Sequence, residues 1–336
     1  MLMVILGAGA SYDSAPSRPP IGNTQYRLPL ANNLFDERPA FRTALTTYRD
    51  IQPIVPYLRS RGNKGLEEVL QELYDNEANH PDRPRQMMAL RFYIRDLIHE
   101  CSTHWLEEVD GITTHKTLLD QIRGSQKDRT LFATFNYDEL LEDALTDHGF
   151  KIVDLNDYIR PDNQFGVYKL HGSMRWARLV AGPSDQPIRR QDLIVKAAKL
   201  NLIEPNYGLG IFENIQENEV ENFPAVPAIA IPINSKSAFE CPDNHLENLV
   251  QHLPKVDKIL AIGWQGKEAH FMSLLKRHLP ILKALCVVSV DDADNILRNL
   301  TSELADKMSP ELSSQAYKYG FSNFVTQRAG MALFDL

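Results

Sequence analysis

The sequence predicts a three-layer α/β fold, in which helices cover both faces of a mostly parallel β-sheet. Short apolar runs alternate with helical patterns along most of the 336 residues, which is typical of such sheets. Three of these runs end in residues suited to ligand binding: the turn at residues 7–11, Asn136 and His171. Open sheets of this Rossmann-like kind bind ligands at the carboxyl ends of their strands. The three motifs are therefore expected to share one edge of the sheet.

The composition excludes several classes of protein. A hydrophobic fraction of 43% and a charged fraction of 24% are those of a globular protein. The net charge of -8 argues against a general nucleic-acid binder, which needs clustered Lys and Arg. No apolar stretch approaches the roughly 18 residues of a membrane span, and no basic segment precedes the first apolar run. We expect a soluble, cytoplasmic protein that binds neither nucleic acid nor membrane.

The cysteines and histidines do not show the spacing of a metal site. Cys101, Cys241 and Cys286 lie far apart, and no CxxC, HxxxH or HExxH pattern occurs. We expect three buried free cysteines, no disulfide and no bound metal.

The elements follow one another in an order that favours a single domain over residues 1–336. Residues 2–6 form the first buried strand, and the segment at about 36–125 is a helical block inserted after it. Further strands are expected at 130–135, 151–154, 166–170, 227–233, 258–263 and 284–290, with helices at 138–147, 245–253 and 267–279. An irregular excursion occupies about 180–226, and the residues after 290 read as mostly helical.

The glycine turn after the first strand has two interpretations. Gly7 and Gly9 would allow a pyrophosphate to approach the backbone closely, and Ser11 would add a hydroxyl donor. The same glycines would also suit a tight strand-to-helix turn that binds nothing. The dehydrogenase fingerprint is incomplete, because Tyr12 occupies the position of its third glycine.

Asn136 and His171 each follow a predicted strand and also have two interpretations. Asn136 could cap the next helix, as could Asp138, or it could hold a ribose or a water through its amide. His171 could be a structural histidine, or it could act as a general base near neutral pH. Gly172 would then let a ligand pass close to the backbone.

These motifs together resemble the sirtuin, or SIR2-like, superfamily. The segments GAGAS at 7–11, TFNYD at 134–138 and LHGS at 170–173 occur in the order of that family's motifs. The segments 259–264 and 287–291 resemble its strands near the adenosine. Two departures are that the paired CxxC motifs of the deacetylases are missing and that Phe135 stands where they have Gln. The chain therefore resembles the SIR2-like effectors of bacterial anti-phage defence, which hydrolyse NAD+ and lack the zinc module, more than it resembles the deacetylases.

The resemblance implies an NAD+ glycohydrolase that releases nicotinamide and ADP-ribose. Asn136 would orient the ribose or the attacking water, His171 would act as the base, and Asp138 would contact the carboxamide or stabilise positive charge. The residues expected to bind NAD+ are Gly7, Ala8, Gly9, Ala10, Ser11, Pro29, Gly172, Gly263, Trp264, Ser289 and Asp291.

The resemblance also implies regulation, because unchecked NAD+ cleavage would kill the host cell. We expect a homo-oligomer or a complex with a separately encoded sensor protein, formed through the helical block. Two other functions stay open. One is a silent module that binds NAD+, ADP-ribose or a signalling nucleotide, and the other is an NAD-dependent protein deacylase.

Overall fold

The computed structural model describes residues 1–15, 24–76, 79–125, 128–180, 190–197, 202–209, 225–233, 239–290 and 292–336. The chain divides into two compact units. Unit 1 comprises Met1–Thr24, His104–Leu170 and Asp243–Leu336, and unit 2 comprises Gln25–Thr103 and His171–Pro242. Each unit is described by itself.

Unit 1 contains a six-stranded sheet in which every neighbouring pair is parallel. Its order is β3-β2-β1-β7-β8-β9. The strands are β1 (Leu2–Leu6), β2 (Thr130–Thr134), β3 (Phe165–Lys169), β7 (Lys258–Ile262), β8 (Leu282–Val288) and β9 (Met308–Tyr317). Numbered by their succession within this sheet, the strands run 3-2-1-4-5-6, which is the order of the dinucleotide-binding α/β fold. The predicted Rossmann-like sheet is confirmed.

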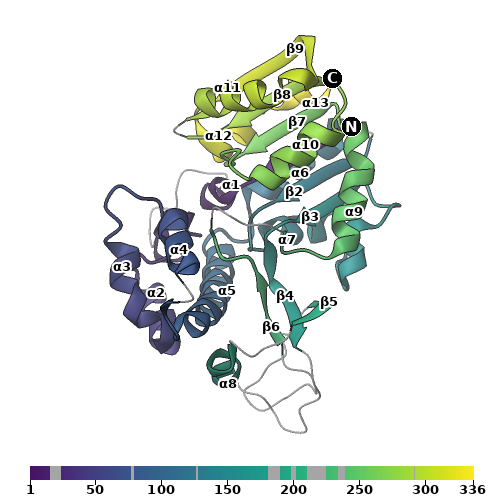
Figure 1. Ribbon diagram of the computed structural model, residues 1–336. Coiled ribbons are helices and arrows are strands. Elements are labelled where there is room, and N and C mark those ends of the chain that lie inside the picture. The colour runs from purple at the N-terminus through teal and green to yellow at the C-terminus, as the bar shows by residue number, and fades with distance from the viewer. Residues whose placement is uncertain are drawn as a thin grey trace. The chain divides into compact units, whose positions relative to one another are not determined.

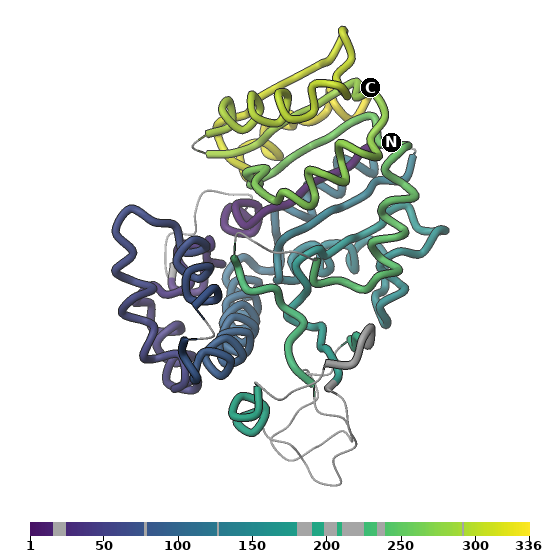
Figure 2. The backbone as a smooth tube through the Cα atoms, in the orientation of Figure 1, coloured from purple at the N-terminus to yellow at the C-terminus, as the bar shows by residue number. Residues whose placement is uncertain are grey.

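Four strands of the sheet are buried and mostly apolar because both faces of the sheet are covered. Every residue of β1, β2, β3 and β7 is buried, as expected for parallel strands between two helical layers. The N-terminal strand lies between strands from much later in the chain, which Figure 2 shows by its purple colour among teal and green.

Helices form the two outer layers of unit 1. The helices α6, α7, α12 and α13 pack together, whereas Figure 1 shows α9, α10 and α11 on the near face of the sheet. The helices are α1 (Ala8–Tyr12), α6 (Thr114–Ser125), α7 (Leu140–Asp147), α9 (Asp243–His252), α10 (Ala269–His278), α11 (Ala293–Glu303), α12 (Gly320–Thr326) and α13 (Met331–Phe334). Short 3-10 helices are η5 (Leu155–Ile159), η7 (Leu253–Lys255) and η8 (Ala305–Lys307).

Unit 2 combines a helical block with a small antiparallel sheet. Its sheet has the order β5-β4-β6, with β4 (Gly172–Val180), β5 (Leu202–Leu209) and β6 (Ala225–Ile229). Its helical elements are η1 (Thr24–Tyr26), which begins at the boundary, η2 (Ala31–Asn33), α2 (Pro39–Thr47), η3 (Arg49–Ile54), α3 (Val55–Arg59), α4 (Leu66–Asp75) and α8 (Arg190–Val195). The long helix α5 (Arg83–Glu108) crosses from unit 2 into unit 1. The expected helical character of residues 36–125 is confirmed.

One expected strand is wrong, and two other segments differ in part from the expectation. Residues 151–154 form no strand, because the Asp157 carboxylate accepts from the Val153 and Asp154 amides in a capping box at the start of η5. The predicted strand at 227–233 corresponds to β6, which pairs antiparallel with β4 outside the main sheet. The segment after Val290 contains β9, an edge strand whose residues are partly or fully exposed, so no apolar run predicts it.

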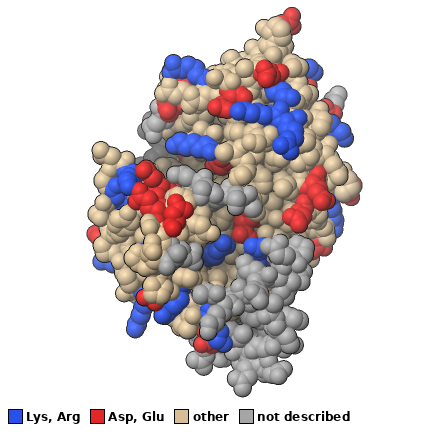
Figure 3. Space-filling model, viewed as in Figure 1, with Lys and Arg blue, Asp and Glu red and all other residues tan. Residues whose placement is uncertain are grey.

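The surface and the cysteines agree with the composition. On the face shown in Figure 3, acidic and basic side chains are interspersed. The three cysteines are buried and unpaired, as expected. In the part of the chain that the structure describes, no helix is long and apolar enough to span a bilayer. The predicted excursion at 180–226 lies largely outside the described residues, apart from α8 and β5.

Candidate functional site

The candidate site of unit 1 lies where the order of the strands reverses in the sheet. β1 and β7 are adjacent, but the next strands along the chain, β2 and β8, lie on opposite sides of this pair. The segments that follow β1 and β7 therefore diverge, and such a point is where open α/β sheets bind ligands. The turns that begin at Gly7 and Gly263 both occupy this position.

The glycines of these two turns interlock. The Gly7 amide donates to Ile262 at 3.0 Å, and the Gly9 amide donates to the Gly263 carbonyl at 3.2 Å. A Cβ atom on Gly7 would lie 2.4 Å from the Gly263 oxygen, and Gly263 itself has a φ of +59°. Backbone packing thus accounts for these glycines, which is the ligand-free interpretation of the turn. Ala8, at the tip of the turn, remains exposed.

Asn136 reaches into the glycine turn with its amide. Its Nδ2 group donates to the Gly7 carbonyl at 2.9 Å and to Ser11 Oγ at 2.8 Å. Because a backbone carbonyl can only accept, Nδ2 rather than Oδ1 must face Gly7, and the orientation of the amide is fixed. The backbone amide of Asn136 donates to Thr134 Oγ1 at 3.1 Å. Asn136 is therefore bound to the turn rather than to the helix that follows.

The remaining oxygen of Asn136 is the notable feature of this arrangement. Asn136 is 7% exposed, and its Oδ1 atom has no hydrogen-bond partner among the described residues. A buried polar atom left unpaired costs free energy, so such an atom calls for an explanation. With both amide hydrogens already in use, this group can only accept. Its natural partner is a donor, such as a ribose hydroxyl or a water molecule.

Asp138, which lies close to Asn136 in the chain, forms a buried polar network with Lys169 and Glu142. Asp138 Oδ1 accepts from the amide of Leu140, the first residue of α7, at 3.2 Å, although Glu139 is the N-cap residue of this helix. The backbone carbonyl of Asp138 accepts from the Lys169 ammonium, which also contacts Glu142 at 2.8 Å. Sequence reasoning missed Lys169 and Glu142. The available signal was a lysine at the end of an otherwise apolar strand.

Trp264 packs in an aromatic cluster. Its ring stacks on Phe135 with centroids 5.9 Å apart, and the edge contact with Phe271 has centroids 5.7 Å apart. Its indole nitrogen donates to Glu268 at 2.5 Å, and the residue is 3% exposed. Phe135, at the position where the deacetylases have Gln, is part of this core.

The other predicted cofactor residues of unit 1 are placed as follows. Ala10 and Ser11 are buried in α1. Ser289 follows β8 at the carboxyl edge of the sheet, where its amide donates to Tyr317 at 3.0 Å. Asp291 lies outside the described residues. The structure thus brings together the 7–11 turn, Asn136, Gly263 and Trp264.

Three predicted residues belong to unit 2. Pro29 is buried just before η2. His171 is partly exposed, and its carbonyl accepts from the Ala230 amide at 3.0 Å. Gly172 has a φ of +82°, and a Cβ atom there would lie 1.8 Å from the Ala228 oxygen. The close contact that requires a glycine at this position is therefore with β6.

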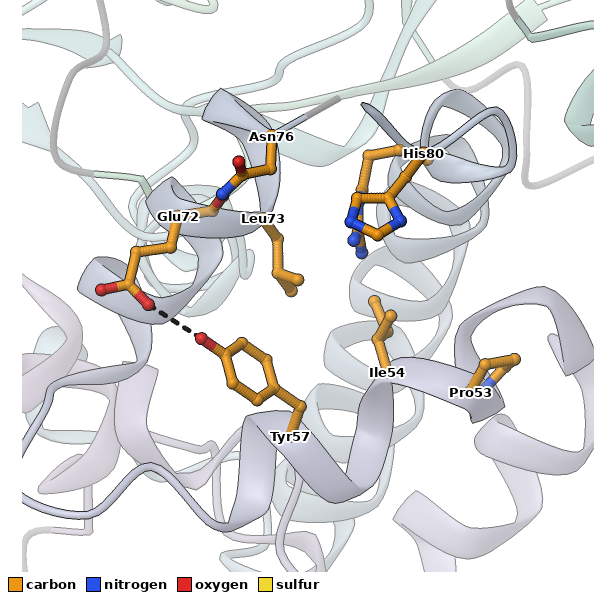
Figure 4. Close-up of a pocket in the computed structure, with 8 residues that line it drawn as sticks. Pro53, Ile54, Tyr57, Glu72, Leu73, Asn76 and His80 are labelled. Atoms are coloured by element: carbon orange, nitrogen blue, oxygen red, sulfur yellow. Dashed lines mark hydrogen bonds between the residues drawn. The ribbon is translucent and has the colours of Figure 1, made fainter. Parts of the chain in front are cut away.

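A separate hollow of about 380 Å³ lies in the helical block of unit 2. Figure 4 shows Ile54 and Leu73 pointing into it, beside a hydrogen bond of 2.8 Å from the Tyr57 hydroxyl to Glu72. None of the predicted site residues lines this hollow. Within the described ranges, no cluster of three His, Cys, Asp or Glu side chains could hold a metal ion.

Comparison with known proteins gives one sequence match. Residues 130–284, from the start of β2 into β8, match the family model of the SIR2-like domain. No curated protein is significantly similar to the chain.

Solved sirtuin structures are also similar, at low identity. A crystal structure of Sir2 with the inhibitor EX-527, 2'-O-acetyl-ADP-ribose and a deacetylated p53 peptide is 13% identical, with a TM-score of 0.38 over 98% of this chain and 94% of that one. A Sir2–p53 peptide–NAD+ structure is 13% identical, with a TM-score of 0.38 over 99% and 92%. Similarity to the SIR2-like domain is shown for residues 130–284 of the chain.

Proposed function

We propose that this protein hydrolyses NAD+ at the bond between nicotinamide and ribose, releasing nicotinamide and ADP-ribose. The observation that carries the proposal is the buried, acceptor-only Oδ1 atom of Asn136 beside the glycine turn. The SIR2-like match over residues 130–284 and the strand order of the dinucleotide-binding fold support NAD+ as the ligand.

Cleavage of the bond between nicotinamide and ribose mainly requires the protein to position the ribose and the attacking water. Nicotinamide leaves as a neutral molecule, and the ribose passes through a transition state that resembles an oxocarbenium ion. Asn136 Oδ1 would accept a hydrogen bond from a ribose hydroxyl or from the attacking water. Because the side-chain amide is already fixed by the glycine turn, it would position that group without a change of conformation. The exposed tip of the 7–11 turn would face the pyrophosphate.

Two further roles are proposed from the sequence context. His171 would accept a proton from water or from a ribose hydroxyl, because imidazole has a pKa near neutrality. Asp138 would supply negative charge near the developing cation. One oxygen of its carboxylate already accepts from the Leu140 amide, so the other oxygen would serve this role.

We further propose that the activity is that of a toxic effector in bacterial anti-phage defence. Such an enzyme must stay inactive until phage infection occurs. Formation of a homo-oligomer, or binding of a separately encoded sensor protein, would control its activity through the helical block at 36–125. Size-exclusion chromatography coupled to light scattering tests the first arrangement. A purified monomer that cleaves NAD+ without any partner would contradict both modes of control.

Product analysis after incubation with NAD+ tests the central proposal. We expect nicotinamide and ADP-ribose from the wild type and at least about a hundredfold less from Asn136→Ala and His171→Ala, given the usual contribution of positioning and general-base groups. A matched control is Asn156→Ala, in η5, which should retain activity. Tight NAD+ binding without cleavage, even with the native partner, would instead favour the binding module. Release of nicotinamide only with an acylated peptide would favour the deacylase.

A further inference from the structure

Lys169 is a buried cation at the carboxyl end of β3. Its side chain is 1% exposed, and its ammonium lies 2.8 Å from Oε1 of Glu142, which is 5% exposed. The Tyr158 hydroxyl donates to the same carboxylate oxygen at 3.2 Å. In the described part of the chain, Glu142 has no other cation within ion-pair distance. The pair is thus almost fully desolvated within unit 1, and the second carboxylate oxygen of Glu142, Oε2, is buried without a hydrogen-bond partner among the described residues.

Such a pair is poorly explained by stability alone. The other residues of β3 are Phe, Gly, Val and Tyr, so an apolar side chain at 169 would match its neighbours. Taking two charges out of water is costly, and apolar replacements of buried ion pairs are often as stable or more so. A role in which the ammonium acts on a further group would account for Lys169 better.

That further group is the backbone carbonyl of Asp138, to which Lys169 also donates. Asp138 is two residues after Asn136, in the loop that joins β2 to α7. The start of this loop is held by the Phe135 amide, which donates to Leu6 at 3.0 Å. Its end is held by the Asp138 carboxylate on the Leu140 amide and by Lys169 on the Asp138 carbonyl.

We propose that Lys169 is a positioning residue for Asn136, and that Glu142 holds the ammonium in place for this task. The ammonium ties the last residue of β3 to Asp138 near the end of the loop, so the Asn136 amide stays directed at the 7–11 turn. The catalytic consequence rests on the proposed function. The ordering of the loop does not.

The test compares Lys169→Met with the double variant Lys169→Met/Glu142→Leu. The single variant leaves a buried carboxylate without its cation and is expected to lose thermal stability. The double variant removes both charges and should recover most of the wild-type Tm, but it leaves the Asp138 carbonyl without its donor. Lys169→Arg keeps a donor and should restore part of the wild-type behaviour.

Two readouts separate positioning from mere stability. In hydrogen exchange without ligand, backbone amides at 136–140 should exchange at least tenfold faster in the double variant than in the wild type. In NAD+ hydrolysis, kcat should fall at least tenfold with a smaller change in KM. Wild-type exchange together with wild-type kcat in the double variant would overturn the proposal.

Lys258→Met is the matched control. Lys258 is also a buried lysine that donates to a backbone carbonyl, that of Phe334, but it lies at the opposite, amino end of the sheet in β7. The Lys258→Met variant should leave both the hydrogen-exchange rates of the backbone amides at 136–140 and the kcat of NAD+ hydrolysis unchanged. If the wild type does not cleave NAD+, the proposed function fails, whereas the exchange experiment still decides whether Lys169 orders the loop.

Discussion

A Cβ atom on Gly9 would lie 2.8 Å from the Cα atom of Gly263. The two turns at the centre of the sheet therefore pack backbone against backbone, with no space for a methyl group between them. Gly263 adds a second restriction, because its φ of +59° is unfavourable for other residues.

Gly9→Ala should therefore lower the free energy of unfolding by about 1–3 kcal/mol, because the methyl group forces the turns apart. Urea unfolding measures the change. Gly124→Ala is the control, since Gly124 lies in α6 with nothing within 4 Å of its Cβ position. It should be neutral or stabilising by up to about 1 kcal/mol. Equal stability of the Gly9 variant and the wild type would show that the turns can separate freely.

The orientation of the Asn136 amide leads to a prediction that does not depend on any activity. Asn136→Asp places an acceptor against the Gly7 carbonyl, whereas Asn136→Ala only removes the donor. At pH 7 the Asp variant should be less stable than the Ala variant by about 1 kcal/mol or more. The difference between the free energies of unfolding of the two variants should become smaller as the pH is lowered toward about 4. At that pH a protonated Asp carboxyl can donate to the Gly7 carbonyl. An Asp variant as stable as the wild type at pH 7 would contradict the assigned orientation.

His115 should make the protein sensitive to acid. Burial, with a further contribution from the charge of Lys169, lowers the pKa of His115 to about 3. In the unfolded chain its pKa is about 6.5. Between these values the unfolded state takes up a proton that the folded state does not, so stability falls as the pH is lowered, by up to about 1.4 kcal/mol per unit.

His115→Leu should remove this part of the acid response. Measured by urea unfolding at pH 7, 6 and 5, its free energy of unfolding should fall less steeply with decreasing pH than that of the wild type. Parallel curves for the two proteins would refute the assignment.

Arg190 anchors α8 to the helical block of unit 2. Its guanidinium donates to Asp96 at 2.8 Å and to the Tyr48 hydroxyl at 3.1 Å. A double-mutant cycle of Arg190→Ala and Asp96→Ala should give a coupling energy of about 1–3 kcal/mol, because the bond is charge-assisted and half-buried. The exposed pair Lys276–Glu303 is the comparison and should couple by less than about 1 kcal/mol. Equal coupling in the two pairs would mean that α8 is not anchored in this way.

The sheet of unit 1 could be predicted because its central strands are buried on both faces. Runs such as Leu2–Leu6 are apolar throughout, and each ends where glycine or a polar residue begins. The edge strand β9 could not be predicted in this way. Its sequence, MSPELSSQAY, has no continuous apolar run, and the strand pairs with β8 along one side only.

The candidate site was predictable in its residues but not in its contacts. Position after a strand selected Gly7, Asn136 and Gly263, and these meet at the centre of the sheet. No sequence pattern shows that Gly9 packs against Gly263, or that Asn136 uses its amide hydrogens on the turn. These facts depend on strands that are more than a hundred residues apart in the chain.

The two segments of unit 2 both follow strands of the parallel sheet at the carboxyl ends of those strands. Gln25–Thr103 comes after β1, and His171–Pro242 comes after β3, before the chain returns through α9 to β7. No residue of either segment takes part in a pairing between the six strands. The sheet can therefore accept additions of different size at the carboxyl ends of these strands without any change of register.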